Sequence, residues 1–108
     1  EEGPDELTYG PLSVNFKRHE ALFEGETIEL TASEFKLLAA LVKNPGRAFS
    51  RSQLIHEAFG YDYEGLERTI DVHVKNLRKK IEPDPGSPRF LKTVYGVGYK
   101  FEPPEEFS

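Results

Sequence analysis

The chain has 108 residues, 37% of them hydrophobic and 31% charged, which suits one domain with a modest core and excludes a multidomain enzyme. It has no cysteine and no long apolar run, so disulfides, thiolate metal sites and membrane spans are excluded and a cytoplasmic chain is expected. Because it lacks an initiator Met and a leader segment, we expect a domain cut from a longer protein.

The net charge of −5 would by itself argue against a nucleic-acid partner, because phosphates are repelled by acidic surfaces. The charges are, however, unevenly spread along the chain. The two ends, residues 1–6 and 102–108, carry seven acids and no base, whereas residues 67–101 carry eight bases and four acids. A basic surface is therefore expected in the last third of the chain.

The segment 7–29 is predicted to form about four short antiparallel strands. Leu12, Val14 and Phe16 alternate with polar residues, as expected of a strand with one buried face. The segment Glu-Gly-Glu at 24–26 separates two further apolar stretches as a turn would. Together these features indicate a β-meander.

Two capped helices are predicted next. Thr-Ala-Ser-Glu at 31–34 has the spacing of a capping box, in which the threonine hydroxyl and the glutamate carboxylate each accept a backbone amide. Apolar residues then recur at helical spacing until Asn-Pro-Gly at 44–46. Ser-Arg-Ser-Gln at 50–53 repeats the signature and opens a shorter helix that ends at Gly60.

A third helix is predicted over about residues 66–82, and its two faces differ. At 100° per residue one side collects Ile70, Val74, Leu77 and Ile81, which predicts a buried stripe. The opposite side, which we call the outward face, is basic and amide-bearing. It consists of Arg68, Val72, Lys75, Asn76 and Lys79, with Thr69 at its margin.

Two interpretations of the outward face are open. In the first, its cations are solvated charges offset by Glu67, Asp71 and Glu82. In the second, the helix enters the major groove of DNA, where lysine and arginine neutralise phosphates or bind guanine. Asn76 can then pair with adenine and Val72 can contact a thymine methyl group.

A β-hairpin is predicted at the end of the domain. Segments 90–95 and 97–101 flank a Gly-Val-Gly turn at 96–98, with Lys92 and Lys100 near the sides of the hairpin. The order of elements is therefore a β-meander, three helices and a hairpin, which is an α+β fold.

The sequence contains no convergent set of catalytic residues. His56-Glu57 begins like the zinc-protease helix motif, but Gly60 stands where the second histidine is needed. Asp71 and His73 lie two apart on a helix, hence about 200° apart, and His73 is expected to be a hydrogen-bonded packing residue. A hydrolytic enzyme is therefore the least favoured class, and we predict no metal and no cofactor.

At this point the pattern resembles the winged-helix output domain of OmpR/PhoB-type response regulators, the transcription factors of bacterial two-component signalling. The resemblance spans about residues 7–101 and rests on five ordered blocks at family spacing. The blocks are LTASEFKLL at 30–38, Pro45-Gly46 with Ser50-Arg51, ERTIDVHV at 67–74, LRKKIE at 77–82 and TVYGVGY at 93–99.

The resemblance implies a winged helix-turn-helix fold with an N-terminal four-stranded antiparallel sheet, three helices and a C-terminal hairpin, the wing. It implies that the third helix lies in the major groove of double-stranded DNA and that the wing, residues 90–101, enters the adjacent minor groove. The wing residues expected to contact DNA are Lys92, Thr93, Tyr95 and Gly96.

The resemblance also implies partners. The loop 60–65 matches the family's transactivation loop, so Asp62, Tyr63 and Glu64 are expected to contact RNA polymerase. A phosphoacceptor receiver domain is expected before the first residue, and paired receivers would hold two such domains as a tandem dimer on direct-repeat half-sites. The implied divisions are a linker remnant at 1–6, the DNA-binding domain at 7–101 and a C-terminal tail at 102–108.

Two departures from the family pattern bear on recognition. Asn76 and Tyr95 stand where family members often carry a cation, so the salt dependence of binding should be weaker and the operator cannot be borrowed from relatives. Tyr95 either rests on DNA or packs on the sheet, and the loop 60–65 either contacts polymerase or packs locally. A protein-interaction module remains the second functional class, because winged helices can dock proteins and the chain is acidic overall.

Overall fold

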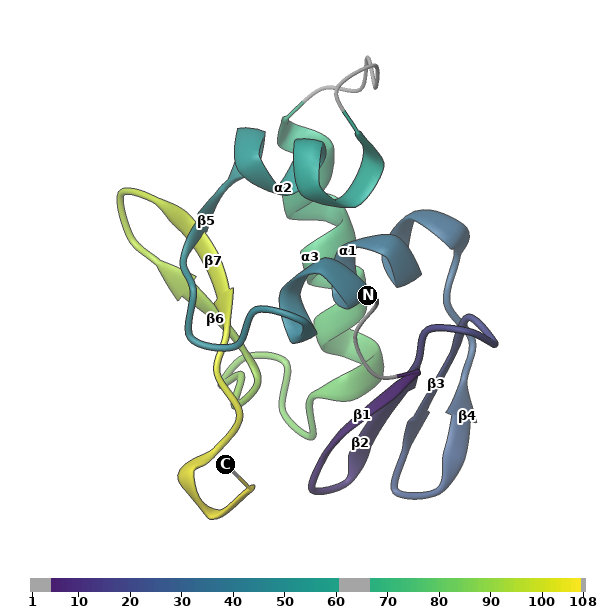
Figure 1. The fold of residues 1–108 in the computed structure, drawn as a ribbon. Helices are drawn as coiled ribbons and strands as arrows, with labels where there is room; N and C mark the ends of the chain where they lie inside the picture. The colour runs from purple at the N-terminus through teal and green to yellow at the C-terminus, as the bar shows by residue number, and fades with distance from the viewer. Residues whose placement is uncertain (1–4, 61–66, 108) are drawn as a thin grey trace.

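Two antiparallel sheets flank three helices in the computed structural model, which describes residues 5–60 and 67–107 (Figure 1). The N-terminal sheet lies on one side of the helices, and the C-terminal hairpin extends from the other. The α+β architecture expected from the sequence is therefore confirmed. Within the described ranges, no helix has the length and apolarity needed to cross a bilayer.

The N-terminal sheet is the predicted meander. Its strands are β1 (Glu6–Tyr9), β2 (Leu12–Asn15), β3 (Glu20–Phe23) and β4 (Glu26–Ile28), in the spatial order β1-β2-β3-β4. Leu12, which is fully buried, pairs with Tyr9 on one side and with Phe23 on the other. The alternation of buried and half-buried residues along β2 follows the period of two that predicted it.

Both predicted capping boxes are present. Thr31 Oγ1 accepts the Glu34 amide at 3.1 Å and Glu34 Oε1 accepts the Thr31 amide at 3.1 Å, at the start of α1 (Ala32–Val42). The same pair of bonds joins Ser50 and Gln53, at 3.1 and 2.9 Å, at the start of α2 (Arg51–Phe59), which ends at its C-cap, Gly60. The third helix, α3, spans Arg68–Ile81.

The helices pack with α3 against α1. The predicted stripe Ile70, Val74, Leu77 and Ile81 is buried, with at most 1% of each residue exposed. Lys80 of α3 also reaches Glu34 of α1, with Nζ 2.6 Å from Oε1. Burial of Glu34 favours its neutral form, but the Lys80 ammonium and the Thr31 amide outweigh burial and lower the pKa of this carboxyl. An ionic tie thus adds to the apolar contact that orients α3.

The wing belongs to a three-stranded sheet rather than to an isolated hairpin. Its strands β6 (Leu91–Val94) and β7 (Gly98–Phe101) are joined by β5 (Phe49–Ser50), in the order β5-β7-β6. The sequence did not indicate β5, because two residues are too few to show a period. Tyr95, Gly96 and Val97 form the turn, and Gly98 lies within β7, so the expectation that both glycines serve the turn is wrong for Gly98.

Candidate nucleic-acid interface

The outward face of α3 is turned to solvent along the helix. Arg68, Lys75 and Lys79 are exposed, and Val72 keeps 55% of its surface exposed. Thr69 and Asn76 are half-buried at the edges. The structure therefore brings together every α3 residue that the sequence assigned to DNA, and the cations surround the methyl groups of Val72 without covering them.

Asp71 ties α3 to two other elements. Its Oδ1 accepts a hydrogen bond from the Tyr99 hydroxyl of β7 at 2.6 Å and one from Arg51 Nε of α2 at 2.8 Å. The Arg51 and Tyr99 bonds hold the pKa of Asp71 below its usual range. Burial and the bond to Asp71 raise the pKa of Tyr99, so its proton stays in place as the donor.

Arg78 forms a second tie, between α3 and β6. Its Nε and Nη2 donate to the carbonyl oxygen of Leu91 at 3.1 and 2.8 Å, and Nη2 also donates to Thr93 Oγ1 at 2.9 Å. Its guanidinium lies 5.5 Å from the ring centroid of Tyr99. Both strands of the wing are therefore joined to α3 by side-chain hydrogen bonds. These bonds fix the orientation of the wing relative to the helix.

Glu82 fixes the chain between α3 and the wing. Although only 5% of it is exposed, its carboxylate accepts amides from Arg89, Phe90 and Leu91 at distances from 2.7 to 3.2 Å. A buried carboxylate needs such donors, because an unpaired buried charge is costly. Glu82 thus sets the point at which β6 begins.

These positioning residues were missed by sequence reasoning. The sequence indicates Asp71 and Glu82 as charges that offset the basic face, and Tyr99 as part of a family block, but it gives none of them a positioning role. Their partners lie between 7 and 28 residues away in the chain, beyond the reach of helix or strand periodicity. The only local sign is a carboxylate at Asp71, between the outward face and the buried stripe of the helix.

The wing carries Tyr95 and Gly96 at its exposed turn, and Lys92 and Thr93 on β6. Tyr95 is 92% exposed, so the expectation that it could pack on the sheet is wrong. Gly96 has φ of +82°, a conformation that glycine adopts without strain, and it is exposed beside Tyr95. Thr93 is exposed and Lys92 is half-buried.

Two further predictions have different outcomes. His73 was expected to be a hydrogen-bonded packing residue, but its Nδ1 is buried without a hydrogen-bond partner, so that part is wrong for this nitrogen. The side chain is half-buried at the margin of the stripe. Asp62, Tyr63 and Glu64, which the resemblance predicts to contact RNA polymerase, lie outside the described residues. Over the ranges 5–60 and 67–107, no acidic or histidine cluster suited to a metal ion is found.

A helix with an exposed cationic face beside an exposed hairpin, both carried on a three-helix core, defines a winged-helix domain. A family model described as "Transcriptional regulatory protein, C terminal" matches residues 25–101. The chain therefore belongs to this family, the winged-helix DNA-binding output domains of OmpR/PhoB-type response regulators. These are transcription-factor domains and not enzymes, which removes the hydrolytic alternative.

Individual relatives agree with the family match. The chain is 49% identical over 96 residues to the sensory transduction protein RegX3 of Mycobacterium tuberculosis (strain ATCC 25618 / H37Rv), which covers 89% of this chain and 42% of RegX3. The chain thus spans less than half the length of this relative.

Solved structures share the fold. The response regulator DrrB of Thermotoga maritima, an OmpR/PhoB homolog, superposes with a TM-score of 0.82 at 32% identity, covering 91% of this chain and 44% of DrrB. The DNA-binding domain of RstA from Klebsiella pneumoniae, solved in complex with the RstA box, gives a TM-score of 0.81 at 29% identity, covering 93% and 99% of the two chains.

Proposed function

We propose that the chain binds duplex DNA sequence-specifically with α3 in the major groove and the wing, residues 90–101, in the adjacent minor groove. The observation that carries the proposal is the outward face of α3, where exposed cations surround an exposed Val72 on a helix fixed from behind by a buried stripe. An α-helix fits the major groove, where lysine and arginine meet phosphates and guanine while an apolar side chain meets the thymine methyl. The RstA domain, similar over almost its whole length, was solved bound to its DNA box.

The charge distribution is compatible with this proposal despite the acidic total. The cations of α3 would contact the phosphates directly, and such short-range contacts are screened least by salt. The seven acids at 1–6 and 102–108 lie outside the α3 segment of the sequence. Each phosphate that the protein neutralises makes the slope of log affinity against log salt more negative by about 0.9. A slope of about −2 to −4 is therefore expected from Arg68, Lys75 and Lys79 together with the wing.

For the whole protein we infer a cytoplasmic response regulator in which a receiver domain precedes this domain. Phosphorylation of the receivers would pair two domains as a tandem dimer on direct-repeat half-sites. In this proposal residues 1–6 end the linker, residues 7–101 form the DNA-binding domain and residues 102–108 form the tail. The similarity to RegX3, described as a sensory transduction protein, supports a signalling role.

A binding selection on random duplexes tests the proposal and yields the operator. We expect enrichment of one half-site, and binding that weakens steeply as salt rises. A protein-interaction module, the competing class, would enrich no sequence and show no salt-dependent affinity for duplexes.

The first prediction contrasts two neighbours on α3. Lys75→Ala should weaken binding to all duplexes and lower the salt slope by about 0.9, because it removes a phosphate contact. Asn76→Ala should instead change sequence preference, at about 1–3 kcal/mol for a lost bidentate base contact. Fluorescence anisotropy over a salt series measures both. Unchanged affinity of the Lys75 variant at low salt would contradict the assignment of α3 as the recognition helix.

The second prediction concerns the wing. Adding the selected duplex should shift the amide resonance of Gly96, and Tyr95→Ala should weaken operator binding several-fold, because Tyr95 is exposed where the minor groove would lie. Val97, 44% exposed at the same turn, supplies a control through Val97→Ala. A silent hairpin in the spectra would leave the wing with a structural role only.

The third prediction concerns RNA polymerase. Reversing the charges of Asp62 and Glu64 to lysine in the full-length regulator should reduce transcription while DNA affinity holds, since the acids would meet a basic protein surface rather than phosphates. Promoter-reporter activity and anisotropy give the two measurements. Equal loss of both would mean that the loop supports α3 and has no partner of its own.

A further inference from the structure

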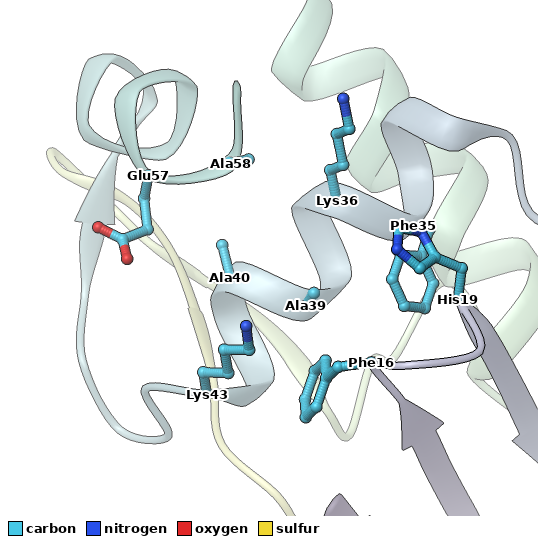
Figure 2. A pocket seen from close by; sticks show the side chains of 9 residues that line it. All are labelled: Phe16, His19, Phe35, Lys36, Ala39, Ala40, Lys43, Glu57 and Ala58. Carbon is cyan, nitrogen blue, oxygen red and sulfur yellow. The ribbon is translucent and has the colours of Figure 1, made fainter. Parts of the chain in front are cut away.

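A shallow groove of about 220 Å³ lies where α1, α2 and the turn between β2 and β3 meet (Figure 2). Its floor is apolar: Phe16 and Ala39 are half-buried there, and Phe35 and Ala40 lie deeper, each 6% exposed. Figure 2 shows Ala39 and Ala40 on α1 between the side chains of Lys36 and Lys43. Because alanine ends at Cβ, a partner's side chain can approach the α1 backbone closely between the two lysines.

Two polar side chains of the groove lie against aromatic rings. Lys43 Nζ lies 4.6 Å from the ring centroid of Phe16, and the His19 ring stacks on Phe35 with centroids 5.0 Å apart. Such contacts hold both side chains on apolar surface while the ammonium group of Lys43 stays in water. The groove therefore offers apolar area and positive charge together.

Lys36 and Lys43 are spaced for a helical partner. They lie seven residues apart on α1, which places them on one face and about 10.5 Å apart along the axis. Both are exposed, and neither forms an ion pair with any residue in the described parts of the chain. Lys17 and Arg18, also exposed, precede His19 in the adjacent turn, where Arg18 pairs with Glu20 at 3.9 Å. Glu57 is the acid among the lining residues. The excess of cations runs against the net charge of −5.

We propose that this groove docks an acidic amphipathic helix of a partner protein. Two of its carboxylates, two helical turns apart, would pair with Lys36 and Lys43, and large apolar side chains midway between them would cover Ala39 and the Phe16 ring. The matching pattern is Glu-x-x-Leu-Leu-x-x-Glu. DNA fits less well, because phosphates gain nothing from an apolar floor.

The partner and DNA can be held at the same time. The other face of α1, with Leu37, Leu38 and Leu41, is buried in the core, and the groove opens on the side of α1 away from α3 (Figure 2). The surface is therefore separate from the outward face of α3. Docking at the groove therefore does not depend on how α3 and the wing bind DNA.

The test uses a synthetic peptide with the pattern Glu-x-x-Leu-Leu-x-x-Glu, held helical by a staple on its far face, added to the 108-residue chain. We expect amide shifts at Phe16, Lys36 and Ala39 and none along α3. Peptides with lysine in place of both glutamates, or alanine in place of both leucines, should bind at least about tenfold more weakly.

A charge swap completes the design. The double variant Lys36→Glu, Lys43→Glu should lose the acidic peptide and gain the lysine peptide, while its affinity for the selected duplex stays unchanged. No shift at up to about 1 mM acidic peptide would overturn the proposal, as would binding indifferent to the swap. Two further outcomes would assign the groove to this chain itself and would also overturn the proposal. One is peptide binding that appears only after residues 1–4 are removed, and the other is self-association that the double variant abolishes.

Discussion

Gly98→Ala should be among the most destabilising single substitutions in the wing. A Cβ at this position would lie 2.1 Å from the carbonyl oxygen of Phe49 and 3.1 Å from the Cα of Ser50, both backbone atoms of β5. Backbone cannot rotate aside as a long side chain can, so β5 must separate from β7. We expect a loss of about 3 kcal/mol in the free energy of unfolding, or roughly 15 °C in Tm, measured by thermal circular dichroism.

Gly96→Ala is the matched control. A Cβ there meets nothing within 4 Å, but the residue has φ of +82°. An alanine in that conformation costs about 1–2 kcal/mol, so the loss should be smaller and the β5–β7 pairing should survive. Amide exchange at Tyr99, which pairs with Phe49, reports that pairing. If Gly96→Ala were the costlier change, turn conformation rather than close approach would explain the need for glycine.

The elements with a local signature were predictable from the sequence. Thr31 and Ser50 begin their helices because a capping box requires residues only three positions apart, and both boxes are present. The buried stripe of α3 follows from a period of 3.6, which the free chain already contains. The outward face is its complement, so every α3 residue assigned to DNA was found on one surface.

The parts that were missed depend on contacts between distant segments. Pairing of Phe49 with Tyr99, which makes the wing a three-stranded sheet, leaves no periodic trace in a strand of two residues. The same holds for Asp71, whose partners lie in α2 and β7. Tyr95 could not be placed from the sequence either, because an aromatic residue beside a turn glycine is compatible with packing or with exposure. In the structure, 92% of the Tyr95 surface is exposed.

Asp71→Asn should reduce the preference for operator over scrambled DNA about tenfold, which corresponds to about 1.4 kcal/mol. The substitution keeps the shape of the side chain but weakens the bonds to Arg51 and Tyr99 that join α2, α3 and the wing. Helix and wing would then be free to shift relative to each other. Binding to the operator requires α3 and the wing to contact DNA in their correct relative positions, whereas nonspecific binding depends on charge alone. Affinities for the selected and scrambled duplexes, measured by anisotropy, give the ratio.

Tyr99→Phe separates positioning from charge. It removes the 2.6 Å hydrogen bond to Asp71 but leaves every charge in place, so a positioning role predicts a similar loss of preference. If Asp71 acted only by repelling phosphates, Asp71→Asn would strengthen binding to both duplexes alike and Tyr99→Phe would change neither. Footprints extend the distinction. In both variants, protection of guanine N7 in the major groove should persist, because α3 keeps its buried stripe. Minor-groove protection by the wing should weaken, because the hydrogen bond from β7 to Asp71 is weakened or lost, although Arg78 still joins β6 to α3.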